Sequence, residues 1–480
     1  MKLHVFLLIL ALSLRAVCAQ ELPDLGDSSQ STLSPLQERR LGASIMQQIR
    51  SSSAYMDDVE VTDYVGQIGY TLVANSPDPG GHFEFFLIND SSINAFALPG
   101  GYIGVHSGLI LAAQSESEMV GVIGHEIAHV TQRHVARMMA AQKKTGLASL
   151  AALAVAILAA SSSPELAQAA IVASQAVPLQ SALSFSRDHE READRVGLQI
   201  VEKSNYDVHA IPTFFERLQR ASQVYEGGAP SYLRTHPLTF ERIADIQNRT
   251  GDIPYRQIPD SLAFHLVRAR LVALQGSASE AVSAFKTRIE QRKSASEVAS
   301  RYGLVVAMLR TENLSSADFD AARMHVDAMR KDAPNHPMII ALAAKLEVRS
   351  GNVKSGLEIY REGLALFPTR KALMYGYADA LMDTGQVVQA AQYLDRSVEL
   401  VDTDPRLFER KAAAHAALGQ RMAQHRAQAE ALLLRGNLTA AIEQLRLAQA
   451  SDDGNFYERS IVDSRLRELM ALDAELRQEK

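Results

Sequence analysis

A regular spacing of glycines constrains the C-terminal half of this chain more than any other feature of its sequence. The glycines that recur every 34 residues are Gly351, Gly385 and Gly419. Seven residues before each of them lies an alanine, namely Ala344, Ala378 and Ala412. A period of this length accommodates two helices, with glycine in the turn between them and a small residue where they pack closely. Because one such unit cannot bury its apolar face alone, we expect the units to stack into a helical solenoid.

The period is that of tetratricopeptide repeats, which we expect over residues 262–470. Two further units share the offsets, one around Gly276 and one around Gly436. Since Gly436 follows Gly419 by only 17 residues, half a period, Pro405–Arg421 is expected to be an incomplete repeat. The segment Gln291–Pro334 is expected to be a degenerate unit. A generic helical bundle with coincident glycines is the alternative.

Length and charge narrow the classes of protein that this chain can represent. With 480 residues the chain is too long for one hydrophobic core. Its net charge of −6, without a dense cluster of Lys and Arg, argues against a nucleic-acid partner. The chain has no Trp, so we expect none of the aromatic belts of bilayer-spanning proteins.

The first residues are typical of a secretory signal peptide. An apolar run, Val5–Leu14, follows a weakly basic start, and the small residue Ala19 ends a cleavage site. We therefore predict a cleaved signal peptide over residues 1–19, with lipidation at Cys18 as the alternative. Cleavage after Ala19 would leave the mature chain without cysteine and hence without disulfides.

Helices and a small sheet are expected between the signal peptide and the repeats. Apolar spacing predicts helices over residues 36–50 and 59–74. Phe83–Ile88 is β-prone, and Ala95–Leu98 and Tyr102–His106 flank a Pro-Gly-Gly turn, which predicts a hairpin. The strand Tyr102–His106 is a candidate to pair with an extended substrate backbone, with an ordinary place in the sheet as the alternative.

The segment His125-Glu126-Ile127-Ala128-His129 has the pattern H-E-x-x-H and follows an apolar run. Residues i and i+4 of a helix share one face, so His125 and His129 can bind one Zn²⁺ ion together. Glu126 can then reach a water that the ion activates, as in zinc peptidases. Two surface histidines on a charged helix are the alternative.

A catalytic zinc site requires a third protein ligand and an open position for water. The charged segment Arg187–Gly197 contains the best candidates, because Glu190 and Asp194 lie four residues apart and face the same way in a helix. Glu190 would complete a set of two histidines and one glutamate around a single zinc ion. Asp194 would orient a ligating imidazole or take part in proton transfer. A solvated helix face is the alternative.

Two further features bear on the control of such a site. His236, which precedes Pro237, is a candidate fourth ligand that would occupy the water position and hold the enzyme inactive. From the sequence alone, a plain surface loop is the favoured alternative. The apolar segment Leu147–Ala160 would span about 21 Å as a helix, whereas the hydrocarbon layer is about 30 Å thick. We expect a core helix there, with a lid over the site or a membrane-contacting helix as alternatives.

Taken together, these motifs resemble the HtpX/CAAX-prenyl-endopeptidase group of zinc peptidases. The residues that carry the resemblance are the H-E-x-x-H motif, the block Ser184–Gly197, and Asn94–Ala97 with Gly100–Gly101. With its repeats and signal peptide, the chain is similar to the periplasmic BepA-type proteases of Gram-negative bacteria, which help maintain outer-membrane protein assembly. The resemblance implies the following roles: His125, His129 and Glu190 as zinc ligands, Glu126 as catalytic base, Asp194 as catalytic helper, and His236 as a histidine that caps the zinc.

We therefore expect a mainly α protein, with an α+β gluzincin-like zinc peptidase domain and a small β-sheet over residues 20–258, followed by the all-α solenoid. The expected function is that of a periplasmic zinc endopeptidase that degrades or processes misassembled outer-membrane proteins and assists their assembly. Its repeats would bind protein substrates, namely outer-membrane β-barrel proteins and their assembly machinery, with a peripheral membrane contact as a further option. The alternative is a tetratricopeptide chaperone or assembly scaffold whose metal site is mainly structural.

Overall fold

The computed structural model describes residues 33–142, 185–224, 230–292 and 295–478. The predicted signal peptide and the apolar segment Leu147–Ala160 lie outside the described residues. Within these ranges, no helix combines the length and the apolarity that a membrane crossing requires.

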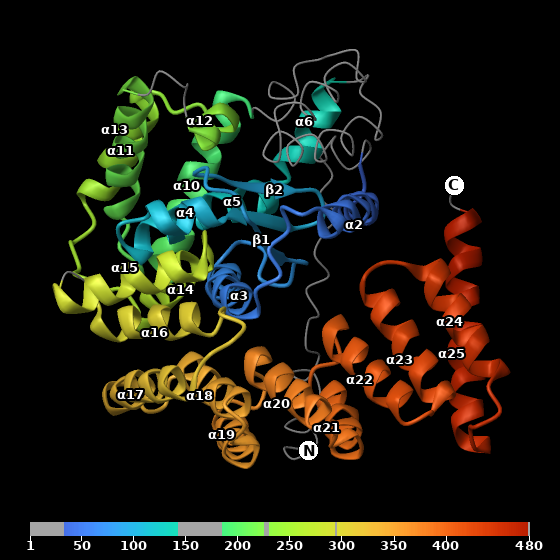
Figure 1. Cartoon of the computed structure of the whole chain (residues 1–480). Coiled ribbons are helices and arrows are strands. Elements are labelled where there is room, and N and C mark those ends of the chain that lie inside the picture. Colours follow the sequence, from blue (N-terminus) through green and yellow to red (C-terminus); the bar gives the residue numbers. More distant parts are fainter. Residues whose placement is uncertain (1–32, 143–184, 225–229, 293–294, 479–480) are drawn as a thin grey trace, which may run out of the picture.

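The N-terminal part packs helices around a small sheet (Figure 1). Its described helices are α2 (Pro35–Ser51), α3 (Val59–Ala74), α4 (Ser107–Ala112), α5 (Glu116–Thr131), α6 (His134–Gln142), α10 (Arg187–Lys203), α11 (Ala210–Val224), α12 (Ser231–Thr235) and α13 (Phe240–Gly251). The helices predicted over residues 36–50 and 59–74 correspond to α2 and α3. Ser34 begins α2 with a capping box, and the Asp58 side chain caps α3, so each start satisfies backbone N–H groups that the helix leaves unpaired.

The sheet contains β1 (Glu84–Ile88), β2 (Ala95–Leu98) and β3 (Tyr102–His106) in the order β1-β3-β2. The predicted hairpin is confirmed, because β2 and β3 pair antiparallel. Its turn requires glycine, since Gly100 and Gly101 have φ angles of 78° and 87°. A Cβ atom on Gly101 would also lie 1.7 Å from the carbonyl oxygen of His82.

The pairing of Tyr102–His106 with a substrate backbone is a wrong prediction. This segment is β3, the central strand, and it bonds to β1 on one side in parallel and to β2 on the other. The hydrophobic pattern of the hairpin gave no sign that β1 lies beside β3. Among the described strands, β2 has a partner on one edge only, so its other edge is free.

The C-terminal part is an array of helices joined by short turns, as the glycine spacing predicts. Its helices are α14 (Leu262–Leu274), α15 (Ala278–Glu290), α16 (Glu297–Met308), α17 (Ser316–Asp332), α18 (Pro337–Arg349), α19 (Val353–Leu366), α20 (Lys371–Asp383), α21 (Val387–Leu400), α22 (Pro405–Ala417), α23 (Arg421–Leu434), α24 (Leu438–Ala450) and α25 (Phe456–Gln478). Gly351, Gly385 and Gly419 follow α18, α20 and α22 with φ between 73° and 89°, the left-handed conformation that ends many helices.

The expectation of an incomplete repeat at Pro405–Arg421 is wrong. Pro405–Ala417 is a full helix, α22, and it packs against α23 across the turn at Gly419. Gly436 lies in the next turn, between α23 and α24, and also has a positive φ of 79°. Two consecutive turns therefore use the same glycine conformation, which produces the half-period spacing.

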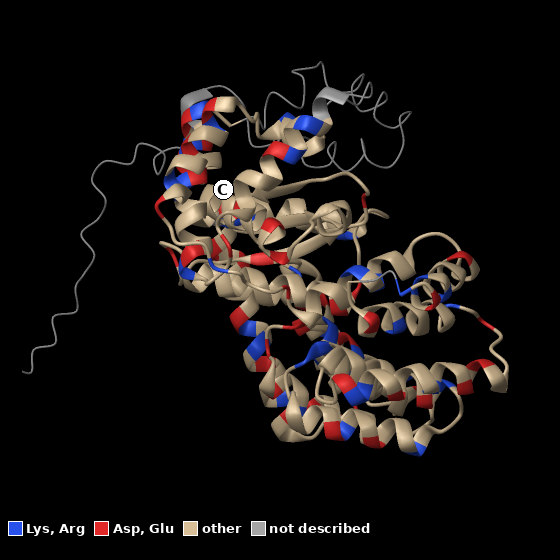
Figure 2. Cartoon of the chain, turned by 90° about the vertical axis from the view of Figure 1, so that its left-hand side faces the viewer, with Lys and Arg blue, Asp and Glu red and all other residues tan. Residues whose placement is uncertain are grey.

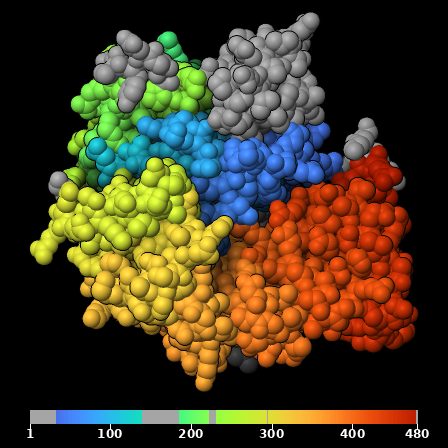
Figure 3. All heavy atoms as spheres, viewed as in Figure 1, coloured from blue at the N-terminus to red at the C-terminus, as the bar shows by residue number. Residues whose placement is uncertain are grey.

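The repeats curve back toward the start of the chain. In Figure 3 the first described segment, in blue, lies directly against the last repeats, in red. The main apolar core continues from α3, α5 and α10 into α14, α16 and α18. Buried contacts thus cross the expected division between residues 20–258 and 262–470, and the division itself stays a prediction.

Candidate metal and catalytic centre

Helices α5 and α10 approach each other closely because glycines lie at their crossing. A Cβ atom on Gly197 of α10 would lie 3.0 Å from the backbone N of His125 in α5, and one on Gly124 would lie 3.3 Å from the carbonyl oxygen of Gly197. Serine side chains begin both helices, Ser115 for α5 and Ser186 for α10. The close crossing brings the charged face of α10 to the histidines of α5.

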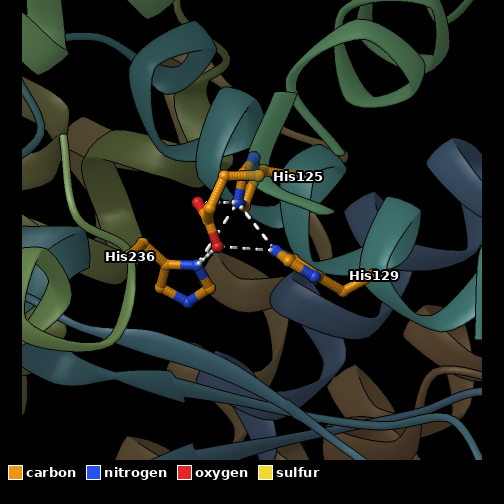
Figure 4. Close-up of side chains that lie close together, drawn as sticks. His125, His129 and His236 are labelled. Atoms are coloured by element: carbon orange, nitrogen blue, oxygen red, sulfur yellow. Dashed lines mark hydrogen bonds and ion pairs between the residues drawn. The ribbon is translucent and has the colours of Figure 1, made fainter. Parts of the chain in front are cut away.

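Four side chains that can ligate a metal converge at this crossing. His125 and His129 come from α5, Glu190 comes from α10, and His236 ends α12; their ligand atoms all lie within 4.8 Å of one another. Figure 4 shows the three imidazoles turned toward a common point. These residues come from three separate segments of the chain, so the fold itself assembles the group.

The separations between the ligand atoms fit a tetrahedral ion. Nε2 of His125 lies 3.0 Å from Nε2 of His129, 3.4 Å from Oε2 of Glu190 and 3.4 Å from Nδ1 of His236. Nδ1 of His236 lies 3.0 Å from Oε1 of Glu190. Ligands at the usual zinc distances of about 2.0–2.1 Å are about 3.3 Å apart in a tetrahedron. Three imidazole nitrogens and the carboxylate of Glu190 therefore surround a space of about this size.

Burial and the neighbouring charges set the protonation of this group. Burial raises the pKa of the Glu190 carboxyl, but His236, His125 and His129 outweigh it and hold that pKa well below its usual range. Burial lowers the pKa of His129 well below its usual value, so its imidazole is neutral. Burial also acts to lower the pKa of His125, but hydrogen bonds with Asp194 and Glu190 raise it to about 10. A cation that binds here must therefore displace a proton from His125.

Asp194 holds the outer side of His125. One carboxylate oxygen lies 3.0 Å from Nδ1 of His125, the ring nitrogen that faces away from the other ligands. Arg242 of α13 donates two hydrogen bonds to Asp194, at 2.7 and 2.8 Å, and also lies 2.7 Å from Oε2 of Glu190. A carboxylate on the outer nitrogen fixes the tautomer and the orientation of a ligating imidazole.

Glu126 is fully buried at the edge of the group. Its Oε1 atom lies 3.4 Å from Nε2 of His236, and neither carboxyl oxygen has a hydrogen-bond partner among the described residues. Burial raises the pKa of its carboxyl, while His236 and His125 lower it. The backbone N–H of Ala97 in β2 also faces Glu126 and lowers this pKa. Glu126 therefore lies between the imidazoles and the free edge of the sheet.

Comparisons with known proteins show the family to which this chain belongs. Residues 61–250 match the model of peptidase family M48, and residues 347–418 match a tetratricopeptide repeat model. The chain is 31% identical to the beta-barrel assembly-enhancing protease of Escherichia coli (strain K12) over 460 residues, which cover 95% of this chain and 92% of that protein. This chain belongs to the same family. The beta-barrel assembly-enhancing protease of Yersinia pestis is 29% identical over 95% of this chain and 93% of its own length. The mitochondrial metalloendopeptidase OMA1 of Arabidopsis thaliana is 34% identical over 34% of this chain and 31% of its own length.

Membership of this family confirms the resemblance inferred from the motifs. The protein is a metalloendopeptidase that carries a peptidase part with a small sheet, followed by tetratricopeptide repeats. The buried group of three histidines and one glutamate is suited to the metal ion on which this class of enzyme depends.

The structure excludes a surface position for each group of predicted site residues. His125 and His129 are not surface histidines, because both are buried. Glu190 and Asp194 face the core, not solvent, because α10 packs on α5. His236 does not lie in a plain surface loop, since its side chain is buried against Tyr232 and the other imidazoles.

Sequence analysis missed several residues that support the site. His134 lies 2.9 Å from Nδ1 of His129 through its own Nδ1, and its Nε2 lies 3.2 Å from Glu192. Glu192 therefore contacts His134 and does not belong to the ligand group. His189 stacks on His134 at 4.6 Å and does not join the four ligating side chains. Arg242 carried only one signal, its position six residues after His236 at the start of an amphipathic helix.

Proposed function

We propose that this protein is a zinc endopeptidase in which His125, His129 and Glu190 hold the ion. The separations of the ligand atoms, close to the edges of a tetrahedron, are the observation that carries the proposal. Imidazole and carboxylate ligands suit Zn²⁺, and one ion per chain fits the single group of this kind among the described residues.

The side chains around the ion would divide the chemistry between them. Bound zinc supplies a Lewis acid that polarises the scissile carbonyl and acidifies water. Glu126 takes the proton of the attacking water and delivers it to the leaving amine, for which its raised pKa suits it. Asp194 holds the imidazole of His125 in place, and Arg242 keeps Asp194 charged.

We infer that His236 restrains the enzyme. Its Nδ1 atom lies among the other ligand atoms, in the position that a catalytic site keeps open. Cleavage then requires that the imidazole moves away. His236→Ala should therefore raise the rate of cleavage of an unfolded protein substrate, and a rate at or below that of the wild type would contradict the restraint.

The free edge of β2 is the proposed place for an extended substrate segment. Main-chain hydrogen bonds to such an edge are independent of side chains, so they suit unfolded segments of many sequences. The backbone N–H of Ala97 lies on this edge beside Glu126. We therefore propose that Ala95–Leu98, and not Tyr102–His106, pairs with the backbone of the substrate.

The names of the relatives point to the substrates. We infer that the enzyme acts in the periplasm, after removal of residues 1–19, on misassembled outer-membrane β-barrel proteins. The repeats over residues 262–470 would bind these proteins or their assembly machinery, and residues 20–258 would form the peptidase domain. Unfolded β-strands are the segments that a free sheet edge can accept.

Two carboxyl variants and one control test the zinc mechanism. Glu126→Gln should keep one zinc ion per chain while cleavage of an unfolded β-barrel protein falls by about 10²–10⁴-fold. Glu190→Gln should lose both zinc and cleavage. Glu202→Gln, at the exposed end of the same helix and outside the ligand group, should keep both. Zinc is measured by elemental analysis of the purified protein.

Two outcomes would count against this function. Normal cleavage by Glu126→Gln would remove the proposed base. If cells that carry an inactive Glu126→Gln protein assemble their outer membrane as the wild type does, a scaffold with a structural metal explains the protein better.

A further inference from the structure

Tyr232 presents an unsatisfied hydroxyl at the metal centre. Its side chain is buried, with 1% of its surface exposed, and its Oη atom has no hydrogen-bond partner among the described residues. Buried hydroxyl groups in folded proteins are almost always hydrogen-bonded, so the missing partner of this hydroxyl requires an explanation.

Contacts from several elements fix the ring of Tyr232 against the ligating histidines. The ring stacks on His236, with 4.7 Å between centroids and 25° between planes, and meets His125 edge-on at 6.3 Å. Phe215 of α11 packs on the ring at 6.2 Å. The backbone N–H of Tyr232 donates to the carbonyl of Ile93, just before β2, at 3.1 Å. These contacts hold the ring against the ligating histidines, and the backbone of Tyr232 is bonded to the segment that precedes β2.

The unpartnered phenol of Tyr232 belongs to a ring that contacts two ligating residues, His236 and His125. Glu126, in turn, has two carboxyl oxygens without a partner among the described residues. An unpartnered donor and an unpartnered acceptor therefore border the same ligand group.

The other donors beside the group already have acceptors. Arg242 donates to Asp194 and to the carbonyl of Pro237 and pairs with Glu190, and His134 lies between His129 and Glu192. Tyr232, unlike Arg242 and His134, has no acceptor among the described residues.

We propose that Tyr232 is a catalytic residue whose phenol O–H donates a hydrogen bond to the carbonyl oxygen of the scissile peptide. The bond strengthens as the attack of water places negative charge on that oxygen, and the phenol keeps its proton throughout. A donor held in place before the reaction stabilises such charge without reorganisation, which is why one such donor has a large effect on rate. The proposal rests on the hydrolytic mechanism proposed above.

Tyr232→Phe removes the hydroxyl and keeps the ring contacts. We expect kcat to fall by about 10²-fold with little change in KM, because the bond forms in the transition state. Zinc content should stay the same, and the melting temperature should stay the same or rise, because no hydrogen bond of the resting structure is lost. A peptide phosphonate, whose tetrahedral oxygens imitate the transition state, should bind about 10²-fold more weakly in calorimetry.

Tyr64→Phe is the matched control. The Tyr64 hydroxyl donates to Glu116 at 2.8 Å in a buried position outside the centre. This variant should lower the melting temperature and leave kcat and phosphonate binding unchanged. The two phenylalanine variants thus separate a catalytic hydroxyl from a structural one.

Wild-type kcat in Tyr232→Phe would overturn the proposal. A lower kcat accompanied by loss of zinc or by a lower melting temperature would also overturn it, because the hydroxyl would then support the fold. Glu126→Gln in the same assay identifies a failure of the hydrolytic mechanism itself, since normal cleavage by that variant contradicts the mechanism whatever Tyr232→Phe does.

Discussion

Two regions of this molecule contain groups of ion pairs: the metal centre and the contact between α3 and the repeats. The two groups differ in how deeply their charges are buried. At the metal centre, Arg242 has 3% of its side chain exposed and neutralises Asp194 and Glu190, which are equally buried. At the second region, the acidic start of α3 meets basic residues of the repeats. We call this second region the α3 clasp; its pairs are Arg270 with Asp58, Arg370 with Glu60 and Asp63, and Arg406 with Asp57.

The basic residues of the α3 clasp come from three separate repeats. Arg270 lies in α14, Arg370 just before α20, and Arg406 in α22. Figure 2 shows acidic and basic residues interspersed along the helices of both parts, so the clasp arises from individual pairs and not from two opposed fields. Its charges are more exposed than those of the centre, up to 64% for the side chain of Asp57.

Burial determines how each set of charges responds to the loss of one partner. A buried pair contributes little net stability when it forms, but the loss of one partner leaves an uncompensated charge in the core. An exposed pair is screened by water and salt, and its loss changes little. Single substitutions at the centre should therefore lower the free energy of unfolding strongly. Substitutions in the clasp should lower it weakly, and more where the charge is more deeply buried.

Arg242→Gln should produce the largest effect on stability. It leaves Asp194 and Glu190 without their buried cation, which lowers the free energy of unfolding by about 3–5 kcal/mol. Urea unfolding at neutral pH measures the change. Arg249→Gln, on the same helix in an exposed pair with Asp245, is the control and should change the free energy by less than about 1 kcal/mol. Equal effects of the two variants would show that burial does not distinguish these pairs.

Arg242 also illustrates what the sequence could not predict. The ligands His125 and His129 follow from a helical spacing of four, and the repeats follow from a spacing of 34, because both patterns depend only on residues close in the chain. Glu190 was found because it shares a helix face with Asp194 in a charged segment that resembles a known family. Each of these features was predicted from residues that lie close to one another in the sequence.

The residues that sequence analysis missed depend on contacts between distant segments. Arg242 reaches Asp194 across 48 positions, and His134 reaches Glu192 across 58. The place of β3 between β1 and β2 likewise depends on how the chain crosses over after β1. An isolated arginine or tyrosine in an amphipathic helix has the same pattern whether it lies at a catalytic site or on the surface. Local spacing cannot separate these outcomes.

Two aspartates, Asp194 in the core and the partly buried Asp63, give a comparison that depends on pH. Burial raises the pKa of both, but at Asp194 the hydrogen bonds from Arg242 and His125 outweigh burial and the pKa is lowered. At Asp63 of the clasp, burial prevails over Arg370 and Lys371 and raises the pKa to about 6. The folded protein therefore takes up a proton on Asp63 at a higher pH than the unfolded chain does. This group stabilises the fold as pH falls through about 6 and destabilises it as pH rises.

Asp63→Asn tests this sign. At about pH 7.5 the variant should be more stable than the wild type by about 1–3 kcal/mol, since two pKa units correspond to about 3 kcal/mol and the side chain is partly exposed. The difference should shrink at about pH 5. Urea unfolding at the two pH values measures it, with the exposed Asp402→Asn as a control that should show no such change. A difference that grows as pH falls would mean that the bond to Arg370 prevails over burial.

Arg406→Gln should have the smallest effect of the three. Its partner Asp57 is largely exposed, so water screens the charge of that carboxylate, and the loss of the pair should change the free energy of unfolding by less than about 1 kcal/mol. The remaining difference from the wild type should disappear in about 0.5 M salt, because ions screen an exposed pair within a few ångströms. The effect of Arg242→Gln should persist in the same salt, because its charges are shielded from ions by the core. If Arg406→Gln proves as damaging as Arg242→Gln, or equally resistant to salt, the α3 clasp is a buried charge network of the same kind as the metal centre.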